Sequence, residues 1–357
     1  MSGIICHRGF FMSQNDGSLN RLILITGATG FVGRNLTTEL VSKEMACCAL
    51  VRQNSNVLPS DVEQIVVPDL TQQTKFAGSL GGVDTIIHLA GLAHTFDVKS
   101  QDAIDKFYDT NVKITEQLGE QAASSGVRRF IFLSSVHVNG TASDKPFSET
   151  DMPAPVSVYA KSKLAAENKL WEIASRSEME VVVIRPPLIY GPGALGNLQT
   201  LVKLVSHRVP MPLGLVNNKR TLCGIDNLID LIITCAESPA AANELFLAGD
   251  ASDVSTARLI ELIGSALQKP AYLAPVPPKL LQFICASVGR SDLSEKLLGN
   301  LQVDISKARD RLLWTPPYSV EEGLMNAFSV GHKIRFGYLK LSLHHRSSGR
   351  PIFVLKI

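Results

Sequence analysis

The chain has 357 residues, of which 45% are hydrophobic and 19% are charged, and its formal net charge is +2. This composition is typical of a globular protein with a substantial core and excludes a disordered or fibrous chain. The nearly balanced charge gives no reason to expect nucleic acid as a partner. No apolar run reaches the roughly 18 residues of a membrane-spanning helix, so no integral membrane segment is expected.

The two ends differ from the rest of the chain. Residues 1–20 have no signal-peptide pattern and are expected to form a disordered extension. Residues 331–357 carry six Lys or Arg and no Asp or Glu, which predicts a basic tail. The six cysteines show neither CxxC nor metal-ligand spacing, so we expect free thiols in a reducing cytoplasm and no metal site.

Short β-branched runs alternate with helical stretches through the first half of the chain. Strands are expected at 21–26, 46–51, 64–67, 84–89, 129–134 and 180–185. Helices are expected at 35–43, 101–124 and 158–175. Strands that are apolar on both faces and separated by helices predict an α/β fold, with a doubly wound parallel sheet covered on both sides.

Three glycines follow the first expected strand in LITGATGFVGRNL, residues 24–36. Gly27 permits a tight turn, Gly30 lets backbone approach a pyrophosphate, and Gly33 lets the helix lie close to the strand. The spacing is one residue wider than GxGxxG. The order of strand, glycine turn and helix predicts a Rossmann-type NAD(P) site, with the pyrophosphate on free N–H groups at the start of the helix and with Phe31 and Val32 among the cofactor-binding residues.

The residue after the second strand bears on the choice of cofactor. An acid there selects NAD through the ribose hydroxyls, whereas an arginine pairs with the 2′-phosphate of NADP. Arg52 occupies this position with no acid near it, which favours NADP over NAD. The alternative is that Arg52 stacks on the adenine or faces water. Asp69 and Leu70, after the third strand, are expected near the adenine.

Tyr159 and Lys163 stand four residues apart, on one face of the expected helix 158–175. The strand before this helix ends at Ser134 and Ser135, in the crevice where parallel sheets bind ligands. A tyrosine is a poor base at neutral pH, and a nearby ammonium should lower its pKa. Lys163 can also hold the nicotinamide ribose, and Ser135 can bind the substrate oxygen. These residues predict acid–base chemistry beside a nicotinamide. The alternative is that Tyr159 and Lys163 lie on an exposed helix face and have no catalytic role.

Beyond residue 185 the chain becomes rich in Pro and Gly, and short helical segments alternate irregularly. This change predicts a smaller C-terminal substrate-binding lobe. We expect the NAD(P)-binding domain at 21–185 plus about 221–250, and the lobe at 186–220 and 251–330.

Six segments resemble the extended branch of the short-chain dehydrogenase/reductase superfamily, the NAD-dependent epimerase/dehydratase family, over about residues 21–330. The segments are TGATGFVG, HLAG at 88–91, TNV at 110–112, SSVHVNG at 134–140, YAKSK at 159–163 and RPPLIYGPG at 185–193. The resemblance implies that Tyr159 is the acid/base, that Lys163 activates it and that Ser135 is the catalytic hydroxyl. It implies that Asn111 steadies Lys163 through water.

The resemblance also implies binding residues. The resemblance adds five cofactor-binding residues to the glycine turn, Tyr159 and Lys163. These five are Leu89, Ala90, Gly91, Pro186 and Leu188. Those for the substrate, besides Ser135, are His137, Asn197 and Arg220, with Arg220 clamping a diphosphate by charge-assisted hydrogen bonds. His88 and His94 are expected to be structural. His137 is expected to be either structural or a substrate contact.

Two departures from the family pattern bear on the reaction. The chain reads VNG at 138–140 where the family often reads VYG, and no glutamate of the dehydratase type stands beside Ser135, which argues against 4,6-dehydration. The resemblance implies hydride transfer at C4 of a UDP-hexose, in sugar synthesis for surface polysaccharides, by a homodimer paired through 101–124 and 157–175. A 4-epimerase, which the resemblance favours, and a 4-keto reductase, which Arg52 favours, both stay open. A reductase of a non-sugar carbonyl or hydroxysteroid is the alternative, and a non-catalytic nucleotide-binding module is a further one.

Overall fold

The computed structural model describes residues 21–68, 74–93, 100–194, 196–287 and 289–328. The expected N-terminal extension and the basic tail lie outside these residues. Contacts divide the chain into two compact units, each described here by itself. Among the described residues, the first unit spans 21–189, 219–254 and 299–320, and the second spans 190–218, 255–298 and 321–328.

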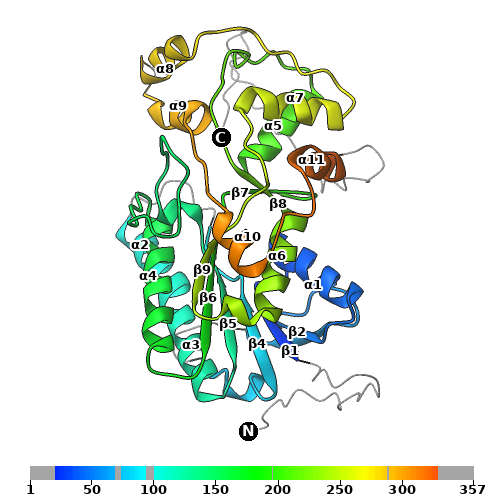
Figure 1. The fold of residues 1–357 in the computed structure, drawn as a ribbon, viewed down its shortest axis with the longest axis vertical. Helices are drawn as coiled ribbons and strands as arrows, with labels where there is room; N and C mark the ends of the chain where they lie inside the picture. Colours follow the sequence, from blue (N-terminus) through cyan, green and yellow to red (C-terminus); the bar gives the residue numbers. More distant parts are fainter. Residues whose placement is uncertain (1–20, 69–73, 94–99, 195, 288, 329–357) are drawn as a thin grey trace, which may run out of the picture. The chain divides into compact units, whose positions relative to one another are not determined.

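A seven-stranded parallel sheet forms the centre of the first unit, with the strand order β3-β2-β1-β4-β5-β6-β9 (Figure 1). The strands are β1 (Leu22–Thr26), β2 (Cys47–Val51), β3 (Glu63–Val66), β4 (Val83–His88), β5 (Arg129–Leu133), β6 (Glu180–Arg185) and β9 (Glu244–Leu247). The predicted Rossmann-type α/β fold is confirmed. The strand order reverses between β1 and β4, and ligands bind at such a switch point in sheets of this kind.

Helices cover both faces of the sheet because the strand side chains alternate between two apolar cores. Ile23 and Ile25 join the core that includes α1 (Phe31–Ser42) and α6 (Ile225–Glu237). Leu24 joins the opposite core, which includes α3 (Ile114–Ser124) and α4 (Val158–Ala174). Figure 1 shows α3 and α4 on one side of the sheet and α1 and α6 on the other. The helix after the glycine turn begins at Phe31, four residues earlier than predicted, because Gly30 itself is the N-cap.

The expected helix 101–124 is continuous but not uniform. It consists of α2 (Gln101–Tyr108), the π-helical turn η2 (Asp109–Lys113) and α3. A π-helical turn is rare and tends to occur at functional sites. The remaining elements of this unit are η1 (Ala77–Ser79), η3 (Val136–Val138), η4 (Pro239–Ala241), α10 (Ser306–Leu312) and β8 (Leu222–Gly224), which pairs with β7 (Leu188–Tyr190).

The second unit is mainly helical. Its helices are α5 (Asn197–Ser206), α7 (Thr256–Ala266), α8 (Pro278–Ser287), α9 (Ser291–Leu298) and α11 (Val320–Phe328). Helix α5 packs on α7, and α8 packs on α9. The backbone N–H of Met211 donates to the carbonyl of Tyr272, and the N–H of Ala274 donates back to Met211.

Residues 299–320, which the sequence placed in the lobe, pack with the first unit instead. Leu301 and Val303 join the core that contains α1 and α6. The backbone N–H of Thr221 donates to Leu301, and the indole of Trp314 donates to Asp230 at 2.8 Å. These apolar and hydrogen-bonding partners come from α6 and from the segment before it, so they hold the late segment against the sheet domain.

Two further findings concern the described part of the chain. No helix there is long and apolar enough to cross a membrane. Its cysteines are free thiols: Cys47, Cys48, Cys223, Cys235 and Cys285.

Candidate active site

The glycine turn lies between the ends of β1 and β4. Gly27 has a φ of +70°, and a Cβ there would lie 2.6 Å from the backbone nitrogen of Ala90. A Cβ on Gly33 would lie 2.3 Å from the carbonyl oxygen of Gly27, so no side chain fits there unless helix α1 moves. At Gly30 the nearest atom, again the Gly27 oxygen, would be 3.2 Å away. The roles predicted for Gly27 and Gly33 therefore correspond to real close contacts.

The start of α1 suits an anion. Gly30 is its N-cap, and no side chain within the described residues caps it. The N–H of Arg34 donates to the carbonyl of Gly30 at 3.0 Å, which begins the i to i−4 pattern of the helix. The N–H groups of residues 31–33 therefore precede the helical ladder and face out of the helix end, where the dipole favours negative charge. This end fits the pyrophosphate of a dinucleotide.

Other predicted cofactor residues lie at the same edge of the sheet. Arg52 is exposed directly after β2, and Leu89 and Ala90 are half-buried directly after β4. Pro186 is buried, and its carbonyl accepts the N–H of Val136 at 3.0 Å. Leu188 is exposed, and Asp69 and Leu70 lie outside the described residues.

Tyr159 lies in the first turn of α4, and Ser135 lies just after β5. The Ser157 hydroxyl caps α4 by accepting the N–H of Ala160 at 3.1 Å. The side chains of Ser135 and Tyr159 lie next to each other. Burial raises the pKa of Tyr159 to about 12, and the neighbouring Ser135 hydroxyl opposes this rise. This raised pKa is opposite in direction to the lowered pKa that the sequence analysis expected.

Lys163 is buried one helical turn further along α4. Its ammonium donates to the carbonyl of Leu133 at 2.8 Å and lies 4.5 Å from the centre of the Phe132 ring. Burial lowers the pKa of Lys163 to about 8, while the charge of Glu167 acts in the opposite direction. The ammonium thus has its own partners at the end of β5.

Asn111 lies on the π-helical turn and bridges to the segment after β4. Its Oδ1 accepts the N–H of Leu92 at 2.7 Å, and its Nδ2 donates to the Leu92 carbonyl at 3.1 Å and to the Ser162 hydroxyl at 3.0 Å. A Cβ on Gly91 would lie 3.1 Å from Asn111 Oδ1 and 3.4 Å from Lys163 Nζ. The predicted cofactor segment therefore touches both the asparagine and the lysine. The water-mediated link that the resemblance implies stays a prediction.

The predicted substrate residues belong to both units, and each is described within its own unit. His137 is exposed on η3, and its backbone N–H donates to the Ser135 hydroxyl at 3.3 Å. Arg220 is half-buried in the first unit, and its Nη1 donates to the carbonyl of Gly299 at 3.2 Å. Burial lowers the pKa of Arg220. Asn197 begins α5 in the second unit, and its side chain lies outside the description.

The sequence analysis missed a buried ion pair beneath this site. Glu167 and Arg185 are both almost fully buried, and Arg185 Nε donates to Glu167 at 3.0 Å. The Ser134 hydroxyl also donates to Glu167. Arg185 Nη1 donates to Asn139 at 3.0 Å, so the residue that replaces the family's usual tyrosine has a partner. The available signal was the position of Glu167, four residues after Lys163 and on the same helix face.

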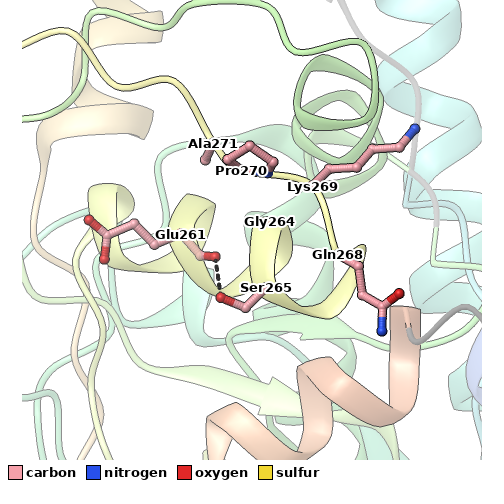
Figure 2. A pocket seen from close by; sticks show the side chains of 7 residues that line it. All are labelled: Glu261, Gly264, Ser265, Gln268, Lys269, Pro270 and Ala271. Atoms are coloured by element: carbon pink, nitrogen blue, oxygen red, sulfur yellow. Dashed lines mark hydrogen bonds between the residues drawn. The ribbon is translucent and has the colours of Figure 1, made fainter.

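A shallow pocket of about 250 Å³ lies elsewhere, at the end of α7 in the second unit (Figure 2). Its lining residues are Glu261, Gly264, Ser265, Gln268, Lys269, Pro270 and Ala271. The Ser265 hydroxyl donates to the Glu261 carbonyl, and the Lys269 ammonium donates to the Ser206 carbonyl at 2.9 Å. None of the residues predicted from the sequence lines this pocket, so it is not part of the candidate site.

A glycine turn at the switch point of a parallel sheet, together with a Ser–Tyr–Lys cluster, defines a Rossmann-type protein of the short-chain dehydrogenase/reductase class. The profile of the NAD dependent epimerase/dehydratase family matches residues 23–249. The chain belongs to this family.

Comparison with individual proteins agrees. A UDP-glucose 4-epimerase of Vibrio cholerae is 40% identical over 316 residues, covering 87% of this chain and 96% of the relative. An N-acetyl-α-D-glucosaminyl-diphospho-ditrans,octacis-undecaprenol 4-epimerase of Escherichia coli O157:H7 is 28% identical over 86% of this chain and 94% of its own. The structure of a UDP-glucuronic acid 4-epimerase from Bacillus cereus in complex with NAD has a TM-score of 0.70 at 21% identity, covering 86% of this chain and 97% of the other. That structure shows the shared fold.

Proposed function

We propose that this protein is a UDP-hexose 4-epimerase that works with NAD. The observation that carries the proposal is the placement of Ser135 beside Tyr159, one helical turn from the buried Lys163, which itself borders Gly91. The similarity to a UDP-glucose 4-epimerase across nearly the whole length of both proteins supports this reaction.

In this proposal Tyr159 takes the proton from the sugar 4-hydroxyl and returns it to the same oxygen. The Ser135 hydroxyl, which lies beside Tyr159, donates to that oxygen and keeps it within reach of the phenol. Lys163 supplies positive charge beside the nicotinamide ribose and stabilises the phenolate in the loaded enzyme. NAD, when bound, supplies the acceptor that takes the C4 hydride and gives it back to the other face of the sugar. Helix α1 and Gly27, Gly30 and Gly33 would hold its pyrophosphate.

The 4-keto reductase is the second candidate, and Arg52 is the observation that favours it. Arg52 is exposed at the end of β2, where a guanidinium can pair with the 2′-phosphate of NADP. Biosynthetic reductions commonly use NADPH. An Arg52→Asp variant should weaken NADP binding and spare NAD binding if Arg52 contacts the 2′-phosphate. Equal effects on both cofactors would mean that it does not.

For the nucleotide sugar we propose Arg220 as the diphosphate ligand. A guanidinium that is partly withdrawn from water binds an anion more strongly than an exposed one. Arg220 is partly withdrawn from water in this sense, since burial lowers its pKa. His137 and Asn197 remain proposed substrate contacts. The cytoplasmic homodimer and the role in surface-polysaccharide synthesis likewise remain proposals that rest on the family resemblance.

Two assays separate the candidates. The purified protein is incubated with UDP-galactose, and separately with a UDP-4-keto-6-deoxy sugar and NADPH. Conversion of UDP-galactose without net consumption of nicotinamide supports the epimerase, whereas stoichiometric loss of NADPH supports the reductase.

The catalytic residues are tested with two tyrosine variants. Tyr159→Phe should lower kcat by about 10²- to 10⁴-fold. Tyr108→Phe, which changes an exposed tyrosine on α2, is the matched control and should keep its activity. Full activity of Tyr159→Phe would refute the proposed acid–base role.

A further inference from the structure

We propose that His88 is a positioning residue of this active site. It links the segment after β4, which borders the glycine turn, to the π-helical turn that carries Asn111. The proposal concerns a residue that the acid–base scheme does not use. Its kinetic part rests on the proposed function, whereas its structural part does not.

The link is an unbroken series of hydrogen bonds through the first unit. The N–H of Ala90 lies 3.4 Å from the Thr26 hydroxyl, and that hydroxyl lies 2.6 Å from His88 Nδ1. On the other side of the ring, His88 Nε2 lies 2.9 Å from the Thr115 hydroxyl. The Thr115 hydroxyl in turn donates to the carbonyl of Asn111 at 2.8 Å. All three polar side chains in the series are buried.

The ends of the series determine where every proton lies. The N–H of Ala90 can only donate, and the carbonyl of Asn111 can only accept. Because Thr115 uses its single proton on Asn111, its oxygen accepts from His88, so Nε2 carries the ring proton. A neutral ring then has a bare Nδ1, which accepts from Thr26. The network requires a neutral His88 in the Nε2–H form.

The surroundings of the ring favour that neutral form. His88 stacks on Phe132, with the ring centres 5.8 Å apart and an angle of 19° between the rings, and Phe130 lies 5.7 Å away. Burial lowers the pKa of His88 to about 3, and the nearby charge of Lys163 lowers it further. A neutral histidine keeps its hydrogen bonds without adding a second positive charge beside Lys163.

The consequence concerns the geometry of the site. Asn111 holds Leu92 by two hydrogen bonds, and Gly91 fits between Asn111 and Lys163. Residues 89–92 are therefore held at one end by Thr26 and at the other by Asn111, and His88 connects these two anchors. Loss of the link should loosen the segment and misplace the groups around Lys163.

The structural part is tested by hydrogen exchange and by NMR. Thr115→Val removes one link with little change of volume, and Thr115→Ser keeps the hydroxyl. Thr234→Val is the matched control, because the Thr234 hydroxyl donates to the carbonyl four residues earlier at 2.8 Å, as Thr115 does, but in α6. Amide exchange at residues 89–92 should be faster in Thr115→Val, and should be unchanged in Thr115→Ser and Thr234→Val.

NMR of the protein with ¹⁵N-labelled histidine tests the ring itself. One ring signal should show the Nε2–H form at both about pH 6 and about pH 8, and should disappear in His88→Phe. A titrating His88, an Nδ1–H form, or unchanged exchange at residues 89–92 in both Thr115→Val and His88→Phe would overturn the proposal. None of these readouts depends on the substrate.

The kinetic part separates positioning from mere stability. We expect Thr115→Val and His88→Phe to lower kcat by about 10- to 100-fold, with KM for the UDP-sugar changing less than about threefold. Thr115→Ser should restore kcat. Variants that lose thermal stability but keep kcat would show a purely structural role and refute positioning. Absence of 4-epimerase activity in the wild-type protein would instead refute the proposed function, and the exchange and NMR results would still decide the link.

Discussion

Replacing Lys163 by methionine should abolish activity and yet stabilise the folded protein at neutral pH. The side chain is almost fully buried, and burial lowers the pKa of its ammonium from 10.5 to about 8. Since each pKa unit corresponds to about 1.4 kcal/mol, holding this charge in the fold costs about 3 kcal/mol below pH 8. Methionine fills a similar volume but loses the bond to the Leu133 carbonyl, which contributes about 1 kcal/mol. We therefore expect Lys163→Met to gain about 1–2 kcal/mol of unfolding free energy at pH 7.

The pH dependence identifies the cause of this gain. Folded Lys163 releases its proton as pH rises through about 8, whereas the unfolded chain keeps that proton up to about 10.5. Between these values the unfolded state binds more protons, so wild-type stability rises with pH relative to the variant. The advantage of the variant should disappear in this window, and the wild-type protein should be the more stable near pH 10.5.

Urea unfolding measures the difference at several pH values. Trp171 lies on the same helix as Lys163 and reports the transition by fluorescence. Lys161→Met changes an exposed lysine of α4 and should alter stability by less than about 0.5 kcal/mol. If Lys163→Met is less stable than the wild-type protein at pH 7, and by the same amount near pH 10.5, then the cost of burying this charge is not what we infer.

Three other predictions concern the same domain. Glu167→Gln should lower the free energy of unfolding by about 3–5 kcal/mol in urea, because it leaves the buried Arg185 without its counter-charge. The apolar double variant Glu167→Leu/Arg185→Met should lower this free energy by less. A larger loss in the double variant would contradict the reasoning. Gly33→Ala should abolish NAD binding in a fluorescence titration, since its Cβ meets backbone at 2.3 Å, while Gly78→Ala, with nothing within 4 Å, should bind normally. NAD binding by the Gly33 variant would show that helix α1 can shift. The Cys47 thiol, whose pKa burial raises to about 11, should react far more slowly with a disulfide reagent at pH 7 in the folded protein than in guanidinium, and equal rates would argue against its burial.

The parts of the fold that the sequence predicted are those with a local pattern. The parallel sheet follows from apolar runs that alternate with helices, and the glycine turn follows from residues within one short segment. Tyr159 and Lys163 lie on one helix, so their spacing alone places them on one face. Each of these inferences needs only neighbours along the chain.

The features that the sequence did not predict depend on distant partners. Residues 299–320 carry no local mark of the domain that they join, because Leu301 and Val303 acquire their neighbours only when the chain folds back. The pKa of Tyr159 depends on burial, which spacing does not reveal, and so its expected direction is opposite to the one in the structure. The partnership of Glu167 with Arg185 likewise joins a helix to a strand 18 positions away.

The π-helical turn at Asp109–Lys113 determines how α2 and α3 are rotated relative to each other about the helix axis. A helix turns by about 100° per residue, so removing one residue from the wide turn to make it regular would rotate everything on one side of it by that amount. Asn111 would then swing away from Leu92, or else α3 would present a different face to α4. A substitution along α2 or α3 changes only the contacts of one side chain. A single-residue deletion in the π-helical turn would instead change which residues of the helix face α4 and which face the segment after β4.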